Sequence, residues 1–156
     1  PVVTFADSVS FHWNDETIDV THPSNSAHTD GDAVVFFKND NVLHTGDLYF
    51  NNIYPFIDAS SGGSMLGVIE AVTLLLSDID DETRVIPGHG ALSNKAELVQ
   101  YRDMLQSVYA RVLKLKTSGK TVEQVIAAKP SASFDAQWGG GFLKPDVWVG
   151  IIYSAI

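Results

Sequence analysis

Residues 27–50 read AHTDGDAVVFFKNDNVLHTGDLYF, and this stretch decides the fold. Residues 33–37 are a continuous apolar run of the kind found in buried strands. Residues 38–41 are a turn signal and residues 42–45 give the next strand, so the pattern predicts a hairpin. Polar segments that contain glycine, 28–32 and 45–47, flank these strands. Such segments at strand ends are where folds with a sheet gather their functional side chains.

Alternation of apolar and polar residues predicts further strands on the N-terminal side. Residues 2–5, 8–13 and 17–21 have strand composition, with Val9, Phe11 and Trp13 on one face and a turn at 14–16. Beyond residue 50, Ser64 is the expected N-cap of a helix whose apolar residues keep helical spacing as far as Leu76. Residues 84–86 give a short strand that ends at Pro87.

The C-terminal part of the chain has helical character. One helix is expected over about 94–116 and a shorter one from Thr121 to about 128, both with capping-box spacing at their starts. A tail rich in glycine and aromatic residues begins at Pro130, and an apolar run over 147–156 closes the chain. We therefore expect one α/β domain over 1–156: a mixed or antiparallel sheet with strand-end loops in 1–93, and helices and tail in 94–156.

Composition excludes several kinds of protein. The 156 residues include 19 acidic and 10 basic side chains, a net charge of −9, which disfavours binding to nucleic acid or to an anionic membrane surface. The chain has no cysteine, which excludes disulfides, cysteine zinc ligands and a cysteine nucleophile. No run approaches the 18 apolar residues of a membrane span. The composition does not indicate a compartment.

Three short segments each place one metal-capable side chain where a strand passes into a loop with glycine. They carry His28 in HTDGD, Asp47 in TGD and His89 in PGHG. Imidazole nitrogen and carboxylate oxygen suit zinc, manganese or iron. Each segment alone is ordinary turn chemistry, but the ordered set, at separations of 47 − 28 = 19 and 89 − 47 = 42 residues, predicts a metal site.

The stretches AHTDGDAVVFF, VLHTGDLYF and RVIPGHG resemble the metallo-β-lactamase fold hydrolases over about residues 1–110. The resemblance implies an αββα sandwich that binds one or two zinc ions, or another divalent metal. His28, Asp47 and His89 would take the last three ligand roles, with Asp47 bridging. Segments 54–58 and 138–142 are similar to a branch of often exported hydrolases, which implies an exported or periplasmic parent acting on a small molecule.

The chain departs from this family in one respect. The His-x-His-x-Asp-His run of the family is absent and the chain opens at Pro1, so we expect a truncated domain, the C-terminal half of the sandwich, with helices on one face of its sheet. The expected lineage is a metal-dependent hydrolase with an incomplete site, no identified general base and an inactive isolated chain. The alternative is a non-catalytic, oligomerising fragment that at most binds a metal ion. The net charge disfavours a nucleic-acid-processing member.

Other residues receive supporting roles. Asp30 and Asp32 orient His28 or cap the local turn, and His44 packs beside the site. By resemblance Tyr49, Tyr54 and Trp138 line a substrate mouth, or else belong to the core. His12 is structural, and His22 is a loop residue or a ligand. Without the first half, the sheet face of Val34, Phe36 and Val42, or of their alternate neighbours, would be bare, which predicts a homodimer that covers it.

Overall fold

The computed structural model describes all residues 1–156 and contains a six-stranded mixed sheet. The strands are β1 (Ser8–Trp13), β2 (Glu16–Thr21), β3 (Val34–Phe37), β4 (Val42–His44), β5 (Arg84–Ile86) and β6 (Ser93–Asn94). They lie in sequence order, β1-β2-β3-β4-β5-β6. Neighbours are antiparallel except β4 and β5, which are parallel and are joined through a helix. The predicted α/β class with a mixed sheet is confirmed.

Five α-helices and two short 3-10 helices complete the fold. They are η1 (Gly46–Leu48), η2 (Ala59–Ser61), α1 (Met65–Asp78), α2 (Lys95–Thr117), α3 (Val122–Ala127), α4 (Asp135–Trp138) and α5 (Pro145–Ser154). Ser64, Asn94 and Thr121 cap α1, α2 and α3 through side-chain oxygens that accept backbone N–H groups. The caps predicted from sequence therefore fix the three helix starts. None of the helices has the length and apolar character needed to cross a membrane.

The prediction of a strand over residues 2–5 is wrong. These residues form no strand and are exposed, whereas the adjoining hairpin of β1 and β2 forms as expected. β-Branched and aromatic residues favour a strand only when a neighbouring strand offers backbone partners and side-chain contacts. Residues 2–5 lie beyond the last pair of that hairpin, Ser8 with Thr21, and have no such partner.

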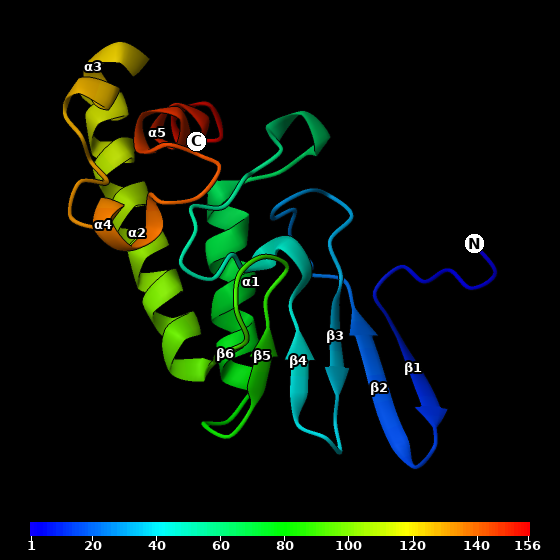
Figure 1. The fold of residues 1–156 in the computed structure, drawn as a ribbon. Coiled ribbons are helices and arrows are strands. Elements are labelled where there is room, and N and C mark those ends of the chain that lie inside the picture. The colour runs from blue at the N-terminus through cyan, green and yellow to red at the C-terminus, as the bar shows by residue number, and fades with distance from the viewer.

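Helices cover one face of the sheet, as Figure 1 shows for α1, which runs behind the strands. On this face Val34, Leu43 and Val85 are buried beneath the helices. They join a core cluster of 27 buried apolar residues to which α1, α2 and α5 contribute most of the helical side chains. The expectation of helices packed on one face of the sheet is confirmed.

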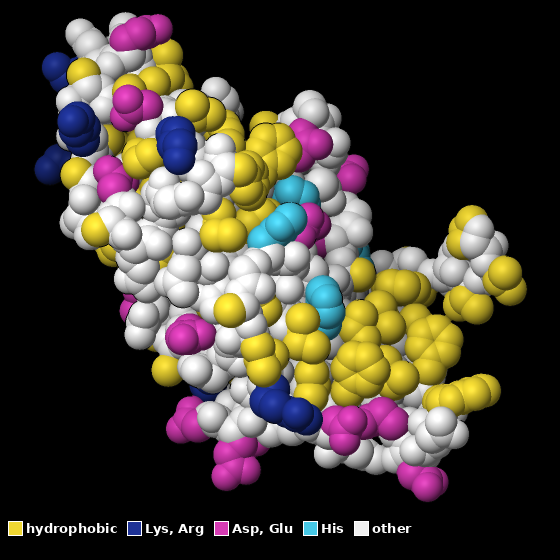
Figure 2. Space-filling model, in the orientation of Figure 1, with side chains coloured by type: hydrophobic (Ala, Val, Ile, Leu, Met, Phe, Trp, Pro, Cys, Tyr) yellow, Lys and Arg dark blue, Asp and Glu magenta, His cyan; other side chains and the backbone are white.

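The opposite sheet face is apolar and open. Residues directly paired across strands share a face, and the registers place thirteen residues on this side, nine of them apolar. The apolar ones are Val9, Phe11, Trp13, Ile18, Val20, Val35, Phe37, Val42 and Ile86, and the polar ones are Glu16, His44, Arg84 and Asn94. None of them is buried, and Trp13 is 72% exposed. Figure 2 shows the resulting hydrophobic patch over β1 to β4.

This open face changes the interpretation of the 33–37 run. The run was expected to be buried on both sides, but only Val34 is buried, whereas Val35 and Phe37 are partly exposed. Val34 and Phe36 point to the helix side, so the bare face consists of their alternate neighbours together with Val42.

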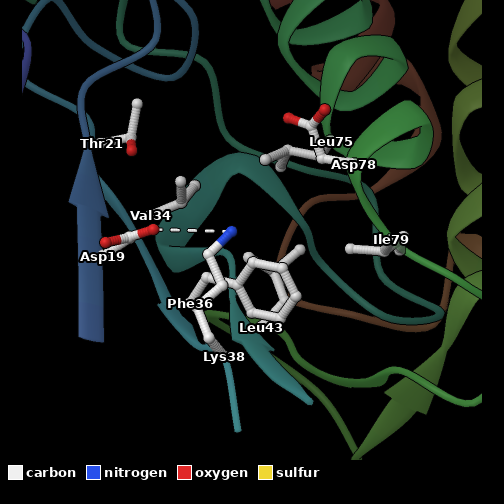
Figure 3. A pocket seen from close by; sticks show the side chains of 9 residues that line it. All are labelled: Asp19, Thr21, Val34, Phe36, Lys38, Leu43, Leu75, Asp78 and Ile79. Carbon is white, nitrogen blue, oxygen red and sulfur yellow. Dashed lines mark ion pairs between the residues drawn. The ribbon is translucent and has the colours of Figure 1, made fainter. Parts of the chain in front are cut away.

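A pocket of about 240 Å³ lies on the helix side, between α1 and strands β2 to β4 (Figure 3). Its wall combines apolar side chains such as Phe36 and Leu75 with the Asp19–Lys38 ion pair, whose Nζ and Oδ2 atoms are 3.5 Å apart. None of His28, Asp47 and His89 lines it. The pocket marks where the β1–β2 hairpin extends past the helix layer.

Candidate metal centre

Sheet topology brings His28, Asp47 and His89 to one end of the sheet. Asp47 lies three residues after the end of β4, and His89 lies three residues after the end of β5, which is parallel to β4. His28 lies before β3, which is antiparallel to β4, so it approaches the same end. A bridge between Phe50 and His89 continues the parallel pairing beyond the strands.

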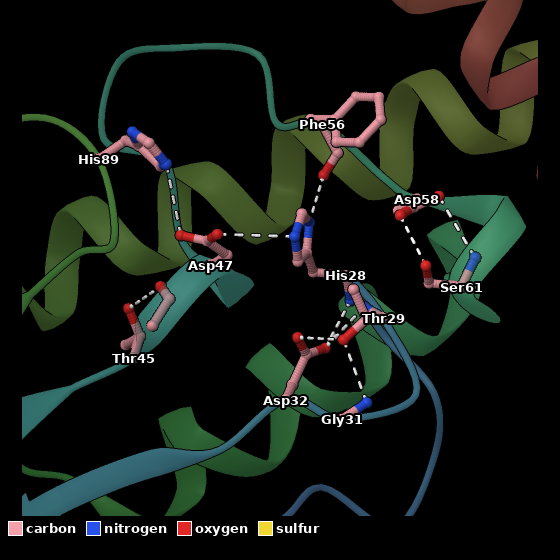
Figure 4. A network of polar contacts seen from close by, with 11 residues as sticks. His28, Thr29, Gly31, Asp32, Thr45, Asp47, Phe56, Asp58, Ser61 and His89 are labelled. Atoms are coloured by element: carbon pink, nitrogen blue, oxygen red, sulfur yellow. Dashed lines mark hydrogen bonds and ion pairs between the residues drawn. The ribbon is translucent and has the colours of Figure 1, made fainter.

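Asp47 lies between the two imidazoles (Figure 4). His28 Nε2 is 3.5 Å from Asp47 Oδ2, and His89 Nε2 is 3.4 Å from Asp47 Oδ1. Two histidines therefore face Asp47, each next to a different carboxylate oxygen. The side chains are partly open to solvent, with His28 the least exposed of the three at 15%. The three side chains therefore lie together at one end of the sheet.

Hydrogen bonds fix the orientation of His28. Its Nδ1 donates to the Phe56 carbonyl oxygen at 2.8 Å. Because a carbonyl only accepts, the neutral ring carries its proton on Nδ1 and turns the free lone pair of Nε2 toward Asp47. A ring held through its other nitrogen is the usual arrangement for a metal-binding histidine.

Asp32 shapes the loop that carries His28. Its carboxylate accepts the His28 backbone N–H at 2.7 Å, the Thr29 N–H at 3.1 Å and the Thr29 hydroxyl at 3.2 Å. The side chain thus caps the local turn and positions His28 through the backbone rather than through the ring. Asp30 is exposed, and no hydrogen bond joins its side chain to His28.

Two glycines give Asp47 its place. Gly46 has φ +53°, a left-handed conformation that favours glycine, and it turns the chain sharply after β4. Gly88 lies against the carboxylate: a Cβ there would be 2.3 Å from Asp47 Oδ1. Its N–H donates to the Gly46 carbonyl at 2.9 Å, which ties the His89 loop to the Asp47 turn. The absent side chain makes the space that the carboxylate occupies.

The three side chains do not surround a single point. No group of three or more His, Cys, Asp or Glu side chains is placed to hold one ion. The arrangement is instead two half-sites that share Asp47: the His28 half-site (Nε2 with Oδ2) and the His89 half-site (Nε2 with Oδ1). The donor types and the tautomer of His28 suit a metal, but each half-site offers two donors where zinc takes four.

A buried polar network supports the His89 loop from behind. Asn51 donates its backbone N–H to the His89 carbonyl at 2.8 Å and its side-chain amide to the Ala91 carbonyl at 3.1 Å. The amide also reaches Glu97 Oε2 at 3.4 Å, an atom that accepts the Ser93 hydroxyl at 2.7 Å. The network holds the loop in place through its backbone, a role that no side-chain motif in the sequence indicated.

The aromatic residues expected at a substrate mouth lie in the core. Tyr49, Tyr54 and Trp138 are at most 2% exposed. The Tyr49 hydroxyl bonds Ser93 at 2.9 Å, and burial raises the pKa of Tyr49 to about 12. Burial, together with a 2.7 Å bond to Asp135, also raises the pKa of Tyr54. These side chains form the packed layer beneath the site, in agreement with the alternative prediction that they belong to the core.

The other histidines lie outside the pair of half-sites. His44 is on the open sheet face, where its Nδ1 accepts the Gly46 N–H at 3.0 Å and so braces the turn before Asp47. His22 Nδ1 donates to the Asp32 carbonyl at 2.7 Å, and His12 lies 3.3 Å from the Thr17 hydroxyl. The Phe56 carbonyl, which orients His28, was not foreseen because a backbone acceptor leaves no mark in the sequence.

Solved structures with a similar fold include an alkylsulfatase and metallo-β-lactamases. No protein-family model and no curated protein matches the sequence. A stereoselective inverting sec-alkylsulfatase from Pseudomonas sp. aligns at 16% identity and TM-score 0.69, covering 97% of this chain and 26% of its own. A metallo-β-lactamase from Pontibacter korlensis aligns at 22% identity and TM-score 0.59, covering 68% of this chain and 49% of its own. The DIM-1 metallo-β-lactamase aligns at 19% identity and TM-score 0.54, covering 65% of this chain and 46% of its own.

These likenesses define the fold class. The chain has part of the metallo-β-lactamase fold, a mixed six-stranded sheet with helices on one face and the other face open. It spans about a quarter of the alkylsulfatase and about half of the metallo-β-lactamases.

Proposed function

We propose that the chain carries part of the metal site of a metal-dependent hydrolase, with Asp47 as a bridging ligand between His28 and His89. One observation carries the proposal: the Asp47 carboxylate presents a separate oxygen to the Nε2 atom of each imidazole. The names of the structural neighbours, metallo-β-lactamases and a sec-alkylsulfatase, add support from the fold.

The chemistry of the donors points to zinc or a similar divalent ion. Bound zinc lowers the pKa of its water to about 7 and polarises the scissile group of a substrate. His28 is oriented for this role because its Nδ1–H donates to the Phe56 carbonyl and its Nε2 faces Asp47. Asp32 is committed to the backbone of the His28 loop and is not free to act as a general base. The half-sites of this chain therefore bind metal without a complete set of ligands.

A zinc-binding measurement with a hydrolysis assay tests the proposal. Competition with a chromophoric chelator should show saturable zinc binding that His28→Ala and His89→Ala each weaken at least tenfold. His12→Ala is the matched control and should bind zinc like the unaltered chain. Hydrolysis of a β-lactam and of a secondary alkyl sulfate by the zinc-loaded chain then separates an enzyme from a metal-binding fragment. Zinc affinity unchanged in both variants contradicts the proposed site.

A second candidate function, a non-catalytic oligomerising module, is favoured by the open sheet face. The β1–β2 hairpin directs Phe11, Trp13 and Ile18 away from the helices, and of its polar residues only Glu16 lies on the same face as these three. The nine apolar side chains of this face, which come from five strands, offer an area on the order of the 800 Å² per partner of a standard interface. A second copy can cover this face by aligned packing of sheet on sheet.

The mass in solution tests this second candidate. Light scattering at micromolar concentration should give about twice the chain mass of 16.9 kDa. Phe11→Asp places a charge at the centre of the β1 apolar row and should return the mass to that of one chain. A single-chain mass for the unaltered protein excludes the homodimer.

A further inference from the structure

We propose that a groove between α1 and β2 binds a small organic cation, an ammonium group that carries an apolar chain. The groove lies on the helix side of the sheet, and none of His28, Asp47 and His89 lines it. The proposed ligand site is therefore separate from the proposed metal site, and it also remains open when a second copy covers the opposite sheet face.

The groove consists of two adjoining lobes. The first lobe is the pocket of about 240 Å³ described above, and the second lobe, of about 280 Å³, continues it along α1. Four side chains line both lobes: Thr21, Val34, Leu75 and Asp78. Together the lobes reach the size of typical ligand pockets, roughly 300–1,000 Å³. A ligand longer than one lobe can therefore lie along the groove.

The two lobes differ in the chemistry of their walls. The first lobe has the charged residues Asp19, Lys38 and Asp78, and Figure 3 shows Asp78 on α1 across the pocket from β2. In the second lobe Asp78 is the one carboxylate, and the apolar side chains are Val34, Leu48, Ala71, Leu74 and Leu75. A charged head group thus fits the first lobe beside Asp78, and an apolar chain fits the second.

The groove is open because the hairpin of β1 and β2 is polar on this side. Its strands turn Ser10, Asp19 and Thr21 away from the apolar open face, and water can solvate these side chains. α1 therefore keeps apolar surface beside the hairpin, with Leu74 55% exposed and Leu75 partly exposed. Apolar surface with a polar border is typical of ligand grooves.

Asp78 lacks a cationic partner. It takes part in none of the ion pairs of the chain, and its side chain accepts one weak hydrogen bond, from the Ser77 hydroxyl at 3.4 Å. Asp78 is also the last residue of α1, where the helix dipole is negative, and the last turn has no basic residue. His22, at the second lobe, donates its Nδ1 proton to the Asp32 carbonyl. A bound cation would supply the missing charge.

The basic side chains nearest the groove have other partners. Within residues 1–94 the only lysine and arginine are Lys38 and Arg84. Lys38 Nζ lies 3.5 Å from Asp19 Oδ2, and Arg84 donates to a backbone carbonyl at 3.2 Å. Lys95, at the start of α2, donates to the Ile79 carbonyl at 2.6 Å. The uncompensated charge of the groove is therefore negative, which favours a cationic ligand over a neutral or anionic one.

Binding of matched probes to the metal-free chain tests the proposal. Titrations followed by backbone-amide NMR compare hexylammonium with 1-hexanol, which lacks the charge, and with ethylammonium, which lacks most of the chain. Hexylammonium should bind roughly tenfold tighter than ethylammonium, at about twofold per partly buried methylene, and about fivefold tighter than 1-hexanol at low ionic strength. The amide signals of Thr21, Leu75 and Asp78 should shift, and that of His89 should not.

Two variants separate the contributions of the head group and the chain. Asp78→Asn should remove the preference for hexylammonium over 1-hexanol and leave 1-hexanol binding unchanged. Leu74→Ala should weaken binding of both six-carbon probes about threefold and keep that preference. Asp81→Asn and Leu92→Ala are the matched controls, because both residues are exposed and line neither lobe. They should bind the probes like the unaltered chain.

Equal affinity of the unaltered chain for hexylammonium and 1-hexanol overturns the cation site. A loss of preference in Asp81→Asn as large as in Asp78→Asn does the same, because the preference would then come from the general negative charge. Shifts that omit Thr21, Leu75 and Asp78 overturn the groove as the place of binding. None of these results bears on the proposed metal site, whose own test uses zinc.

Discussion

Replacing Gly88 by alanine should displace the Asp47 carboxylate while leaving the proposed ligands His28, Asp47 and His89 in the sequence. The added Cβ would lie 2.3 Å from Asp47 Oδ1, which is 1.1 Å short of the 3.4 Å at which ordinary contacts begin. It would also lie 2.7 Å from the Gly46 carbonyl oxygen, a backbone atom that cannot rotate away. The carboxylate must therefore move by about 1 Å or the two loops must separate.

Both responses have a measurable size. Zinc ligands lie within about 0.2 Å of their preferred distances, so a movement of this size removes Asp47 Oδ1 as a ligand. We expect zinc affinity to fall roughly tenfold to hundredfold, as it does when an orienting group is lost. Overpacking against the Gly46 backbone should lower the free energy of unfolding by about 1–3 kcal/mol. Chelator competition and urea unfolding measure the two effects separately.

Gly140→Ala is the control for this substitution. A Cβ at Gly140 meets no atom within 4 Å, so the same chemical change should alter neither zinc affinity nor stability. A folded Gly88→Ala variant that binds zinc within twofold of the unaltered chain would refute the reasoning, because it would show that the carboxylate position does not govern metal binding.

Three further outcomes follow from the structure. Asn51→Leu removes the side-chain hydrogen bond from Asn51 to the Ala91 carbonyl, which helps to hold the His89 loop, and should weaken zinc binding several-fold. Unchanged NMR shifts of the His28 ring should show that the variant has not lost its structure as a whole. Because burial raises the pKa of Tyr49 from 10 to about 12, folding favours its neutral form. That stability is complete below pH 10 and falls above it by up to about 1.4 kcal/mol per pH unit, which urea unfolding at pH 9 to 11.5 should show. Trp13→Lys on the open sheet face should lower the mass measured by light scattering to that of one chain and leave zinc affinity unchanged.

The sequence predicted the local elements well because each carries its own physical signal. The hairpin turn at Asn14 and Asp15 has positive φ at both residues, which these residue types tolerate and two-residue hairpins require. Ser64, Asn94 and Thr121 cap the helices they were expected to cap. Such features depend on neighbours within four residues and are readable without the fold.

Features that depend on distant partners were harder to predict. The apolar run over 33–37 could not show which of its faces lacks a cover, because that depends on the helices and on the register with β2 and β4. At the site, the ligand spacing indicated that His28, Asp47 and His89 meet. It could not show that each imidazole takes a separate carboxylate oxygen, or that a backbone carbonyl orients His28.

Zinc affinity of the Asp47→Asn variant tests the central claim most directly. Asparagine keeps the size of the side chain but removes the charge and one of the two acceptor oxygens. If Asp47 joins both half-sites, the variant should stay folded by circular dichroism and lose zinc binding by about a hundredfold or more, a larger loss than for either histidine variant alone. Zinc binding by Asp47→Asn equal to that of the unaltered chain would contradict the account.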